Sequence, residues 1–177
     1  LYTERGCRYA NKCQFCTIPF GNNIKTSTGE RSAERVAGDI KYFNEKYGIR
    51  IFSFGNETLS GKFMGELTDR LDLLNLNVTL DGYTRTDQFE TKDGKLDMDL
   101  IKIVGKCFRF LQIGFESNDE ETLKSMQKIR KPVNDADLVK ALFSNGIYTH
   151  AFLMVGFPPE RSRYKRKGRD EYINFYV

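Results

Sequence analysis

Short apolar runs alternate along the chain with segments in which apolar residues recur every three or four positions. The runs have the length of strands, and the spacing of the other segments is typical of amphipathic helices. The predicted strands cover residues 1–5, 49–54, 77–83, 108–115 and 148–157, and the predicted helices cover 31–47, 58–74, 96–104, 119–128 and 134–144. Such alternation is typical of β/α units around a parallel sheet. We therefore predict an α/β fold with at least five strands.

Two of these segments carry further signals. The helix predicted over 31–47 has Ser32 as a possible N-cap and Gly48 just past its end, and its apolar face would consist of Val36, Ile40, Phe43 and Tyr47. The segment 148–157 is apolar almost throughout. That composition predicts a strand covered by helices on one face and by the interior of a barrel on the other.

The pattern changes after Pro158 and Pro159 to a charged stretch. Residues 172–177 are candidates for a sixth strand, but the intervening segment is short for a crossover that contains a helix. No Gly/Ser-rich or Pro-rich linker divides the rest of the sequence. We therefore predict one domain over residues 1–160, and a charged C-terminal segment over 161–177 with at most a partial sixth strand.

The charge distribution argues against a nucleic-acid partner. The chain has 28 Lys and Arg residues against 24 Asp and Glu residues, a formal net charge of +4, and six of the basic residues lie within 161–169 without an acid. Without those six, the formal charge becomes −2, so no global positive field attracts nucleic acid. We expect the basic run to be a solvated loop.

Targeting signals are absent from the sequence. No run of about 18 apolar residues occurs, and the segment 1–7 has neither the basic flank nor the apolar stretch of a signal peptide. We therefore expect a cytoplasmic protein without membrane association.

Three of the four cysteines, Cys7, Cys13 and Cys16, lie within ten residues directly after the first predicted strand. The carboxyl ends of parallel strands are where β/α folds build their active sites. A tight, odd-numbered cluster in a reducing compartment indicates a metal or cluster site rather than disulfides. Three thiolates can hold three corners of a cubane iron–sulfur cluster and leave one iron open to a substrate or cofactor.

Two alternatives for these thiols are a zinc site and three unligated cysteines. Structural zinc usually takes four protein ligands, and the remaining candidates, Cys107 and His150, are distant in sequence. We expect Cys107 to be a small buried apolar residue, and His150 to have an ordinary surface or core position. The cluster interpretation is the stronger one.

The loop Arg5-Gly6-Cys7 to Cys16 resembles that of the radical S-adenosylmethionine (SAM) superfamily, whose usual spacing is Cys-x3-Cys-x2-Cys. Here the spacing is Cys-x5-Cys-x2-Cys, so the cluster loop, residues 5–21, carries two extra residues. Further similar segments follow in the superfamily's order: Arg31–Val36, Tyr47–Phe54, Gly114–Ser117 with Thr122–Lys128, and Phe152–Pro158. The Arg-Gly-Cys and Gly-Phe-Glu-Ser motifs are most similar to the group associated with cobalamin-binding domains.

This resemblance implies a partial (β/α)6 TIM-like barrel, truncated or irregular after its fifth strand. It implies a [4Fe-4S] cluster held by Cys7, Cys13 and Cys16, with SAM bound to the open iron. One electron, delivered by a reductant protein such as flavodoxin or ferredoxin, would cleave SAM to methionine and a 5′-deoxyadenosyl radical that removes a hydrogen atom from the substrate. Cobalamin would be a cofactor only if a cobalamin-binding domain lies upstream.

The resemblance also implies SAM contacts at the strand ends. Glu57 would accept a hydrogen bond from the SAM ammonium, and Arg85 would pair with the SAM carboxylate. Glu116 and Ser117 would bind the ribose or the methionine moiety. Each has a simpler alternative: Glu57 as a residue that opens a helix, Arg85 in an ion pair with Asp87 or Glu90, and Ser117 as a helix cap.

Two further residues have a proposed place in the same site. Gly156 would let the backbone approach the adenine, and its alternative role is to shape a turn before Phe157 and Pro158. Phe15 would shield the cluster, and its alternative is a place in the core. Rival functions are a tRNA methylthiotransferase-like enzyme, whose basic field is missing here, and an iron–sulfur electron carrier, which would use four protein ligands.

Overall fold

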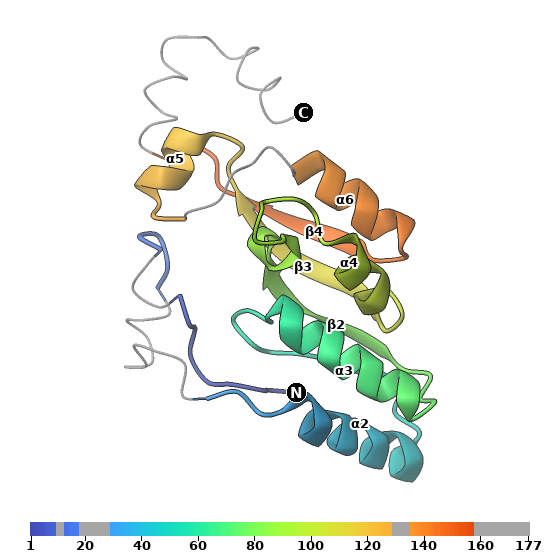
Figure 1. The fold of residues 1–177 in the computed structure, drawn as a ribbon. Coiled ribbons are helices and arrows are strands. Elements are labelled where there is room, and N and C mark those ends of the chain that lie inside the picture. Colours follow the sequence, from blue (N-terminus) through green and yellow to red (C-terminus); the bar gives the residue numbers. More distant parts are fainter. Residues whose placement is uncertain (10–12, 18–28, 129–134, 158–177) are drawn as a thin grey trace.

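The computed structural model describes residues 1–9, 13–17, 29–128 and 135–157. Four parallel strands form one sheet in chain order: β1 (Ile51–Ser53), β2 (Thr79–Arg85), β3 (Phe108–Glu116) and β4 (Tyr148–Leu153). This confirms the predicted α/β fold with a parallel sheet. The described sheet is open rather than a closed barrel (Figure 1). The predicted sixth strand and the basic run lie outside the described residues.

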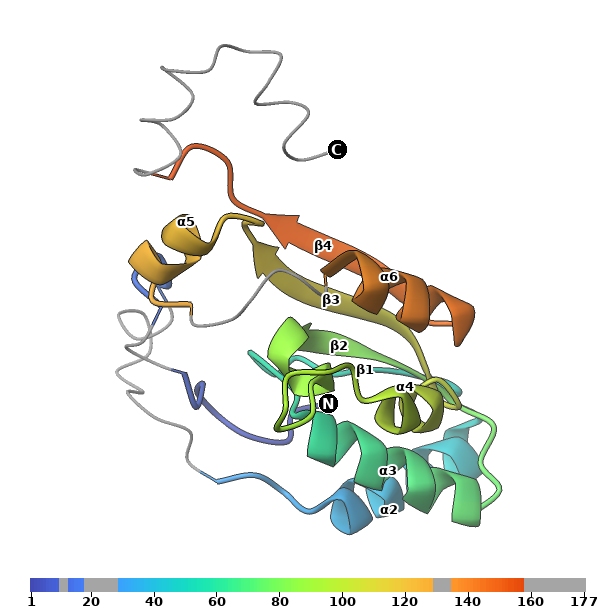
Figure 2. The ribbon, with the colours of Figure 1, turned by 45° about the horizontal axis from the view of Figure 1, so that its top comes forward.

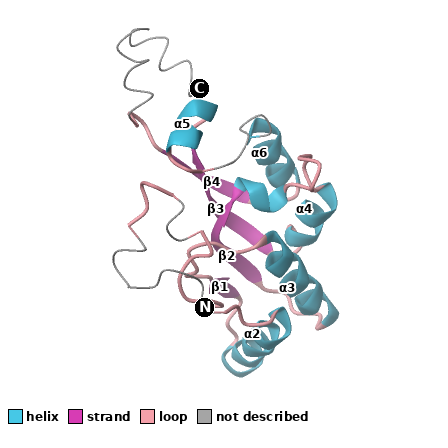
Figure 3. Ribbon diagram, turned by 60° about the vertical axis from the view of Figure 1, so that its left-hand side comes forward, coloured by secondary structure: helices cyan, strands magenta, loops and turns pink. Residues whose placement is uncertain are grey.

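The helices follow the strands in the predicted order. They are α2 (Ala33–Tyr47), α3 (Gly61–Leu73), α4 (Met98–Val104), α5 (Glu120–Ser125) and α6 (Asp135–Ser144), with a short 3-10 helix η1 (Thr86–Phe89) that the sequence pattern did not indicate. Helices α2, α3, α4 and α6 lie along one face of the sheet, whereas α5 lies beyond the carboxyl ends of β3 and β4 (Figures 2 and 3).

The core lies between the sheet and this layer of helices. Strand side chains such as Phe52, Leu80 and Leu111 face the helices and are at most 6% exposed. Phe63, Leu67 and Leu71 of α3 are buried, and so is Leu59 just before the helix. Cys107 is also buried, as predicted for a small apolar residue.

The apolar stripe of α2 is buried over half of its length. Ser32 caps the helix by accepting a hydrogen bond from the Arg35 N–H, and Gly48 ends it with φ +69°, as the sequence indicates. Phe43 and Tyr47, however, are 36% and 59% exposed. Their rings stack on each other, and each packs edge-on against Tyr42, so side chains expected in the core form an exposed aromatic group instead.

Residues 1–5 are not a strand in the structure, which corrects the sequence prediction. Leu1 makes the two hydrogen bonds of a parallel bridge opposite Phe54: its amino group donates to the Ser53 carbonyl (2.6 Å), and its carbonyl accepts from the Gly55 N–H (2.8 Å). Pairing stops there because Thr3 uses its N–H for the Asn56 side chain (3.0 Å) and its carbonyl for the Arg31 N–H (2.8 Å).

Strand β4 is largely exposed, although its composition predicted cover on both faces. It is at one edge of the described sheet, and no described element covers the face opposite the helices (Figure 3). Tyr83, Phe110 and Phe152 therefore present their rings on that face, each 39% exposed. Among the described residues, no helix is long and apolar enough to cross a membrane.

Candidate functional site

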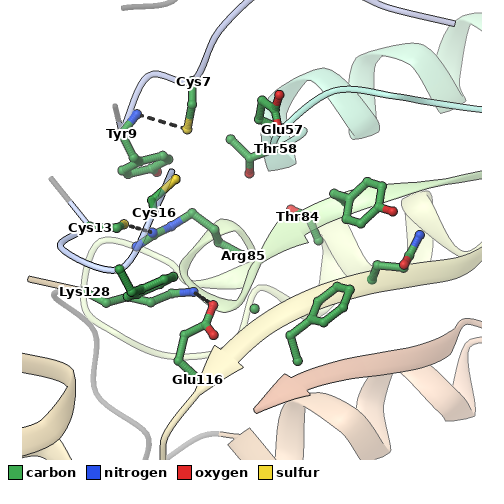
Figure 4. Close-up of a pocket in the computed structure, with 15 residues that line it drawn as sticks. Cys7, Tyr9, Cys13, Cys16, Glu57, Thr58, Thr84, Arg85, Glu116 and Lys128 are labelled. Carbon is green, nitrogen blue, oxygen red and sulfur yellow. Dashed lines mark hydrogen bonds and ion pairs between the residues drawn. The ribbon is translucent and has the colours of Figure 1, made fainter. Parts of the chain in front are cut away.

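A cavity of about 210 Å³ lies at the carboxyl ends of β2 and β3 (Figure 4). Segments far apart in the sequence line it because parallel strands direct their following loops to one edge of the sheet. Its sulfur-bearing and charged lining residues are Cys7, Cys13, Cys16, Glu57, Arg85, Glu116 and Lys128. Nine residues were proposed for the site from the sequence. Seven of them line this cavity, namely the three cysteines, Phe15, Glu57, Arg85 and Glu116.

The three cysteines are free, half-buried thiols on this cavity. The Tyr9 N–H donates to Sγ of Cys7 (3.4 Å), and the Cys16 N–H donates to the Cys13 carbonyl (3.2 Å), which folds the loop back on itself. Burial raises the pKa of the Cys7 thiol, and the neighbouring Cys13 and Cys16 add to the rise. Three thiols without a histidine or carboxylate among them suit an iron–sulfur cluster.

The described residues contain no group of three His, Cys, Asp or Glu side chains close enough to hold one metal ion. A cubane cluster makes a different demand, since each thiolate binds its own iron atom. The donor chemistry of Cys7, Cys13 and Cys16 and their shared cavity therefore fit a [4Fe-4S] cluster with one iron that has no thiolate ligand.

The three residues that follow β1 closely, Gly55, Asn56 and Glu57, make different contacts. A Cβ on Gly55 would lie 2.6 Å from the ring of the exposed Tyr2, so a side chain here would displace that ring. The Asn56 side chain is buried and binds Thr3. Glu57 lines the cavity and lies four residues before the start of α3, whose N-cap is Ser60, so it does not open that helix.

Thr58, beside Glu57, brings a hydroxyl group to the same wall (Figure 4). The residue is 3% exposed, and its Oγ1 atom has no hydrogen-bond partner among the described residues. A buried hydroxyl without a partner is unfavourable. Its position on the cavity wall makes it a ready contact for a polar group of a bound cofactor.

Arg85 at the end of β2 is nearly buried and pairs with Asp87, through a 2.7 Å contact from Nε to Oδ1. That ion pair is the alternative weighed from the sequence. The guanidinium also stacks on the Tyr9 ring, at 4.0 Å from the ring centre, and its Nη1 lies 4.0 Å from Sγ of Cys13. Burial favours loss of the charge, but Asp87, Tyr9 and Cys13 outweigh it and raise the pKa of Arg85.

Glu116 at the end of β3 enters the cavity from an unusual backbone conformation. Its φ is +64°, and the pairing of β3 with β4 shifts register between Gly114 and Glu116. Non-glycine residues seldom adopt this left-handed region, and functional sites are where such strain gathers. The Glu116 carboxylate accepts a hydrogen bond from Nζ of Lys128 at 2.7 Å.

Lys128, which the sequence did not single out, supplies a second cation. Its side chain is 4% exposed, and an ammonium has three donors, of which one goes to Glu116 in the described part of the chain. Burial lowers the pKa of the Lys128 ammonium, and Glu116 offsets part of that effect. The loop holding the cysteines is attached near it, because the Gln14 N–H donates to the Met126 carbonyl (3.0 Å).

Ser117 and Gly156 are the two predicted site residues that do not line this cavity. Ser117 is fully buried and lines a second cavity of about 190 Å³, with Asn118 and Asp135 among its neighbours. Its hydroxyl accepts from the Asp119 N–H (3.1 Å), while Asp119 itself caps α5. Gly156 has φ +83°, a conformation that favours glycine in a turn.

Comparison with known proteins agrees with this geometry. The sequence profile of the Radical SAM superfamily matches residues 2–163. The chain is 24% identical over 164 residues to the anaerobic magnesium-protoporphyrin IX monomethyl ester cyclase of Synechocystis sp., and 25% identical over 165 residues to the cytidylyl-2-hydroxyethylphosphonate methyltransferase of Streptomyces wedmorensis. Each alignment covers 90% of this chain, but only 31% and 28% of the respective relative.

Among solved structures, the cobalamin-dependent S-adenosylmethionine radical enzyme OxsB has a similar fold, with a TM-score of 0.70 at 16% identity. The match covers 97% of this chain and 26% of OxsB, two of whose matched structures contain aqua-cobalamin, one of them with S-adenosylmethionine as well. The chain thus spans about a third or less of the length of these proteins. With its parallel sheet, its three-cysteine loop and a profile match over nearly its whole length, this chain belongs to the radical SAM superfamily.

Proposed function

We propose that this chain is the catalytic core of an enzyme that cleaves SAM reductively at a [4Fe-4S] cluster. What supports the proposal is one cavity at the strand ends that is lined by three cysteines, two acids and two buried cations. An electron carrier would need no such polar wall, since its cluster generally takes all four ligands from the protein.

In this proposal Cys7, Cys13 and Cys16 each hold one iron, and SAM binds the remaining iron. When bound, the cluster supplies the electron that cleaves SAM to methionine and a 5′-deoxyadenosyl radical. The protein orients SAM and keeps water and stray hydrogen donors away. Phe15, half-buried on the cavity, shields the cluster side.

The charged wall suits the two charged groups of SAM. Glu57 accepts hydrogen bonds from the ammonium. Lys128 gives one of its three donors to Glu116 among the described residues, and the other two point to the SAM carboxylate as their partner. Leaving either SAM group unpaired in the cavity would cost about 1–3 kcal/mol or more. Glu116, whose carboxylate is fixed by the hydrogen bond from Lys128, binds the ribose. Arg85 also lines the cavity, but it contacts Tyr9 and Cys13 of the cluster loop.

The final reaction and substrate lie beyond this step. The curated relatives are a cyclase and a methyltransferase, so the radical chemistry of this family serves different products. We propose that a reductant protein such as flavodoxin or ferredoxin delivers the electron. Cobalamin would join the cofactors through a domain outside residues 1–177, as the similarity to a cobalamin-dependent enzyme suggests.

Anaerobic reconstitution with iron and sulfide tests the proposal. We expect about four irons per chain, and an EPR spectrum of the reduced protein that changes when SAM is added. Cys7→Ala, Cys13→Ala and Cys16→Ala should each abolish the visible absorption of the cluster, whereas the control Cys107→Ala should retain it. Binding of zinc alone, loss of the cluster in the control, or a spectrum indifferent to SAM would refute the proposal.

A further inference from the structure

The guanidinium of Arg85 joins the cysteine loop to the end of β2. Its Nε donates to Oδ1 of Asp87 (2.7 Å), its plane lies over the Tyr9 ring, and its Nη1 lies 4.0 Å from Sγ of Cys13 (Figure 4). The side chain is 10% exposed. A full positive charge is therefore held beside one of the three thiols, away from bulk water.

Tyr9 belongs to the interval between Cys7 and Cys13, which is five residues long. Its hydroxyl lies 3.3 Å from Oδ2 of Asp87 and accepts from Nε2 of Gln88 (2.9 Å). Gln88 in turn accepts from the Gly61 N–H at the start of α3 (3.2 Å). Tyr9 thus attaches the long interval to η1, through Asp87, which also pairs with Arg85, and through Gln88, which contacts the start of α3.

A fixed cation beside a cysteine ligand acts on the uptake of an electron. Reduction moves one electron from an external donor to the cluster, with no bond made or broken and no proton transferred. The negative charge that arrives is stabilised by a cation a few ångström away, because the partly buried site screens charges weakly. Asp87 opposes this effect, but it contacts Arg85 and Tyr9 rather than the cysteine.

We propose that the fixed positive charge of Arg85 raises the reduction potential of the cluster. Asp87 lowers this potential and also holds Arg85 in place. The inference rests on the proposed function, since it requires the cluster. It differs from a role in binding the SAM carboxylate, because an effect on the potential exists without SAM.

The test is a redox titration of the reconstituted protein without SAM, with dithionite as the electron donor and EPR as the readout. Arg85→Gln should lower the midpoint potential. For this one-electron step, a shift of about 59 mV corresponds to a tenfold change in the ratio of reduced to oxidised cluster. Arg85→Lys keeps the charge and should stay nearer to the wild type. Asp87→Asn should raise the midpoint. The control Lys62→Gln, on an exposed side chain of α3, should leave it unchanged.

The opposite shifts of the midpoint potential expected for Arg85→Gln and Asp87→Asn distinguish an electrostatic role from a structural one. If Arg85 and Asp87 only kept the loop folded, Arg85→Gln and Asp87→Asn would shift the midpoint in the same direction or lose iron alike. Such a result, or a midpoint indifferent to Arg85→Gln, overturns the inference. Should Arg85→Gln fail to bind iron, a midpoint of Asp87→Asn at or below the wild type overturns it. A wild-type protein without a cluster would refute the proposed function itself.

Discussion

The ammonium of Lys128 lies 2.7 Å from Oε1 of Glu116, directly above the Cα atom of a glycine in β3. The two side chains are 4% and 10% exposed. A Cβ on Gly114 would lie 2.6 Å from both Oε1 and Nζ, so the missing side chain provides the space for the pair. The left-handed backbone of Glu116, with φ +64°, directs its carboxylate into the cavity from the end of the strand.

Removing one partner of this pair should cost more stability than removing both. Lys128→Met leaves the Glu116 carboxylate buried without its cation, which should cost about 3–5 kcal/mol of unfolding free energy. Glu116→Gln added to Lys128→Met should restore part of that loss, because no charge then remains unpaired. Urea unfolding of the two single variants and the double variant measures the coupling between the residues. Strictly additive losses would show that the cavity already solvates Glu116.

The space above Gly114 gives a second prediction. Gly114→Ala should destabilise the protein by about 1–3 kcal/mol, because the added methyl must push the buried ion pair apart. Gly38 is the matched control: it lies inside α2, and a Cβ there would meet nothing within 4 Å. Gly38→Ala should raise stability by about 0.5–1 kcal/mol, since alanine favours a helix interior. Thermal unfolding compares the two, and equal effects would contradict the steric argument.

Thr58 tests whether the cavity receives a polar ligand. Its buried Oγ1 has no partner in the described residues, so Thr58→Val should leave stability unchanged or raise it. The same variant should weaken SAM binding to the reconstituted protein by about two- to tenfold, which corresponds to one lost hydrogen bond of about 0.5–1.5 kcal/mol. Thr68→Val is the control, because its Oγ1 is also buried without a described partner, but in α3 and away from the cavity.

Equilibrium dialysis with SAM, together with urea unfolding, measures both effects on the two threonine variants. The expected result is a loss of affinity in Thr58→Val alone. Equal affinities would remove Thr58 from the site and leave its hydroxyl without a role.

Several parts of the fold and site were predictable because their signals are local. The order of strands and helices follows from apolar periodicity, and the cap by Ser32 and the end of α2 at Gly48 follow from residues within one turn. The three cysteines were singled out by their close spacing, and Glu57 and Glu116 by the resemblance to the radical SAM superfamily. They line one cavity because parallel strands bring their ends to one edge, whatever their separation in the chain.

Other features were decided by the tertiary structure. The sequence alone did not decide whether Arg85 pairs with the SAM carboxylate or with a neighbouring acid such as Asp87. It also did not indicate Lys128 as a site residue. Their positions depend on which way the backbone turns at the strand ends and on which loop packs above: the register shift and φ +64° at Glu116, and the attachment of Tyr9 to η1. Periodicity along one segment predicts which face of an element is apolar. It contains no information on a partner brought from a distant segment, because that contact exists only after the chain has folded.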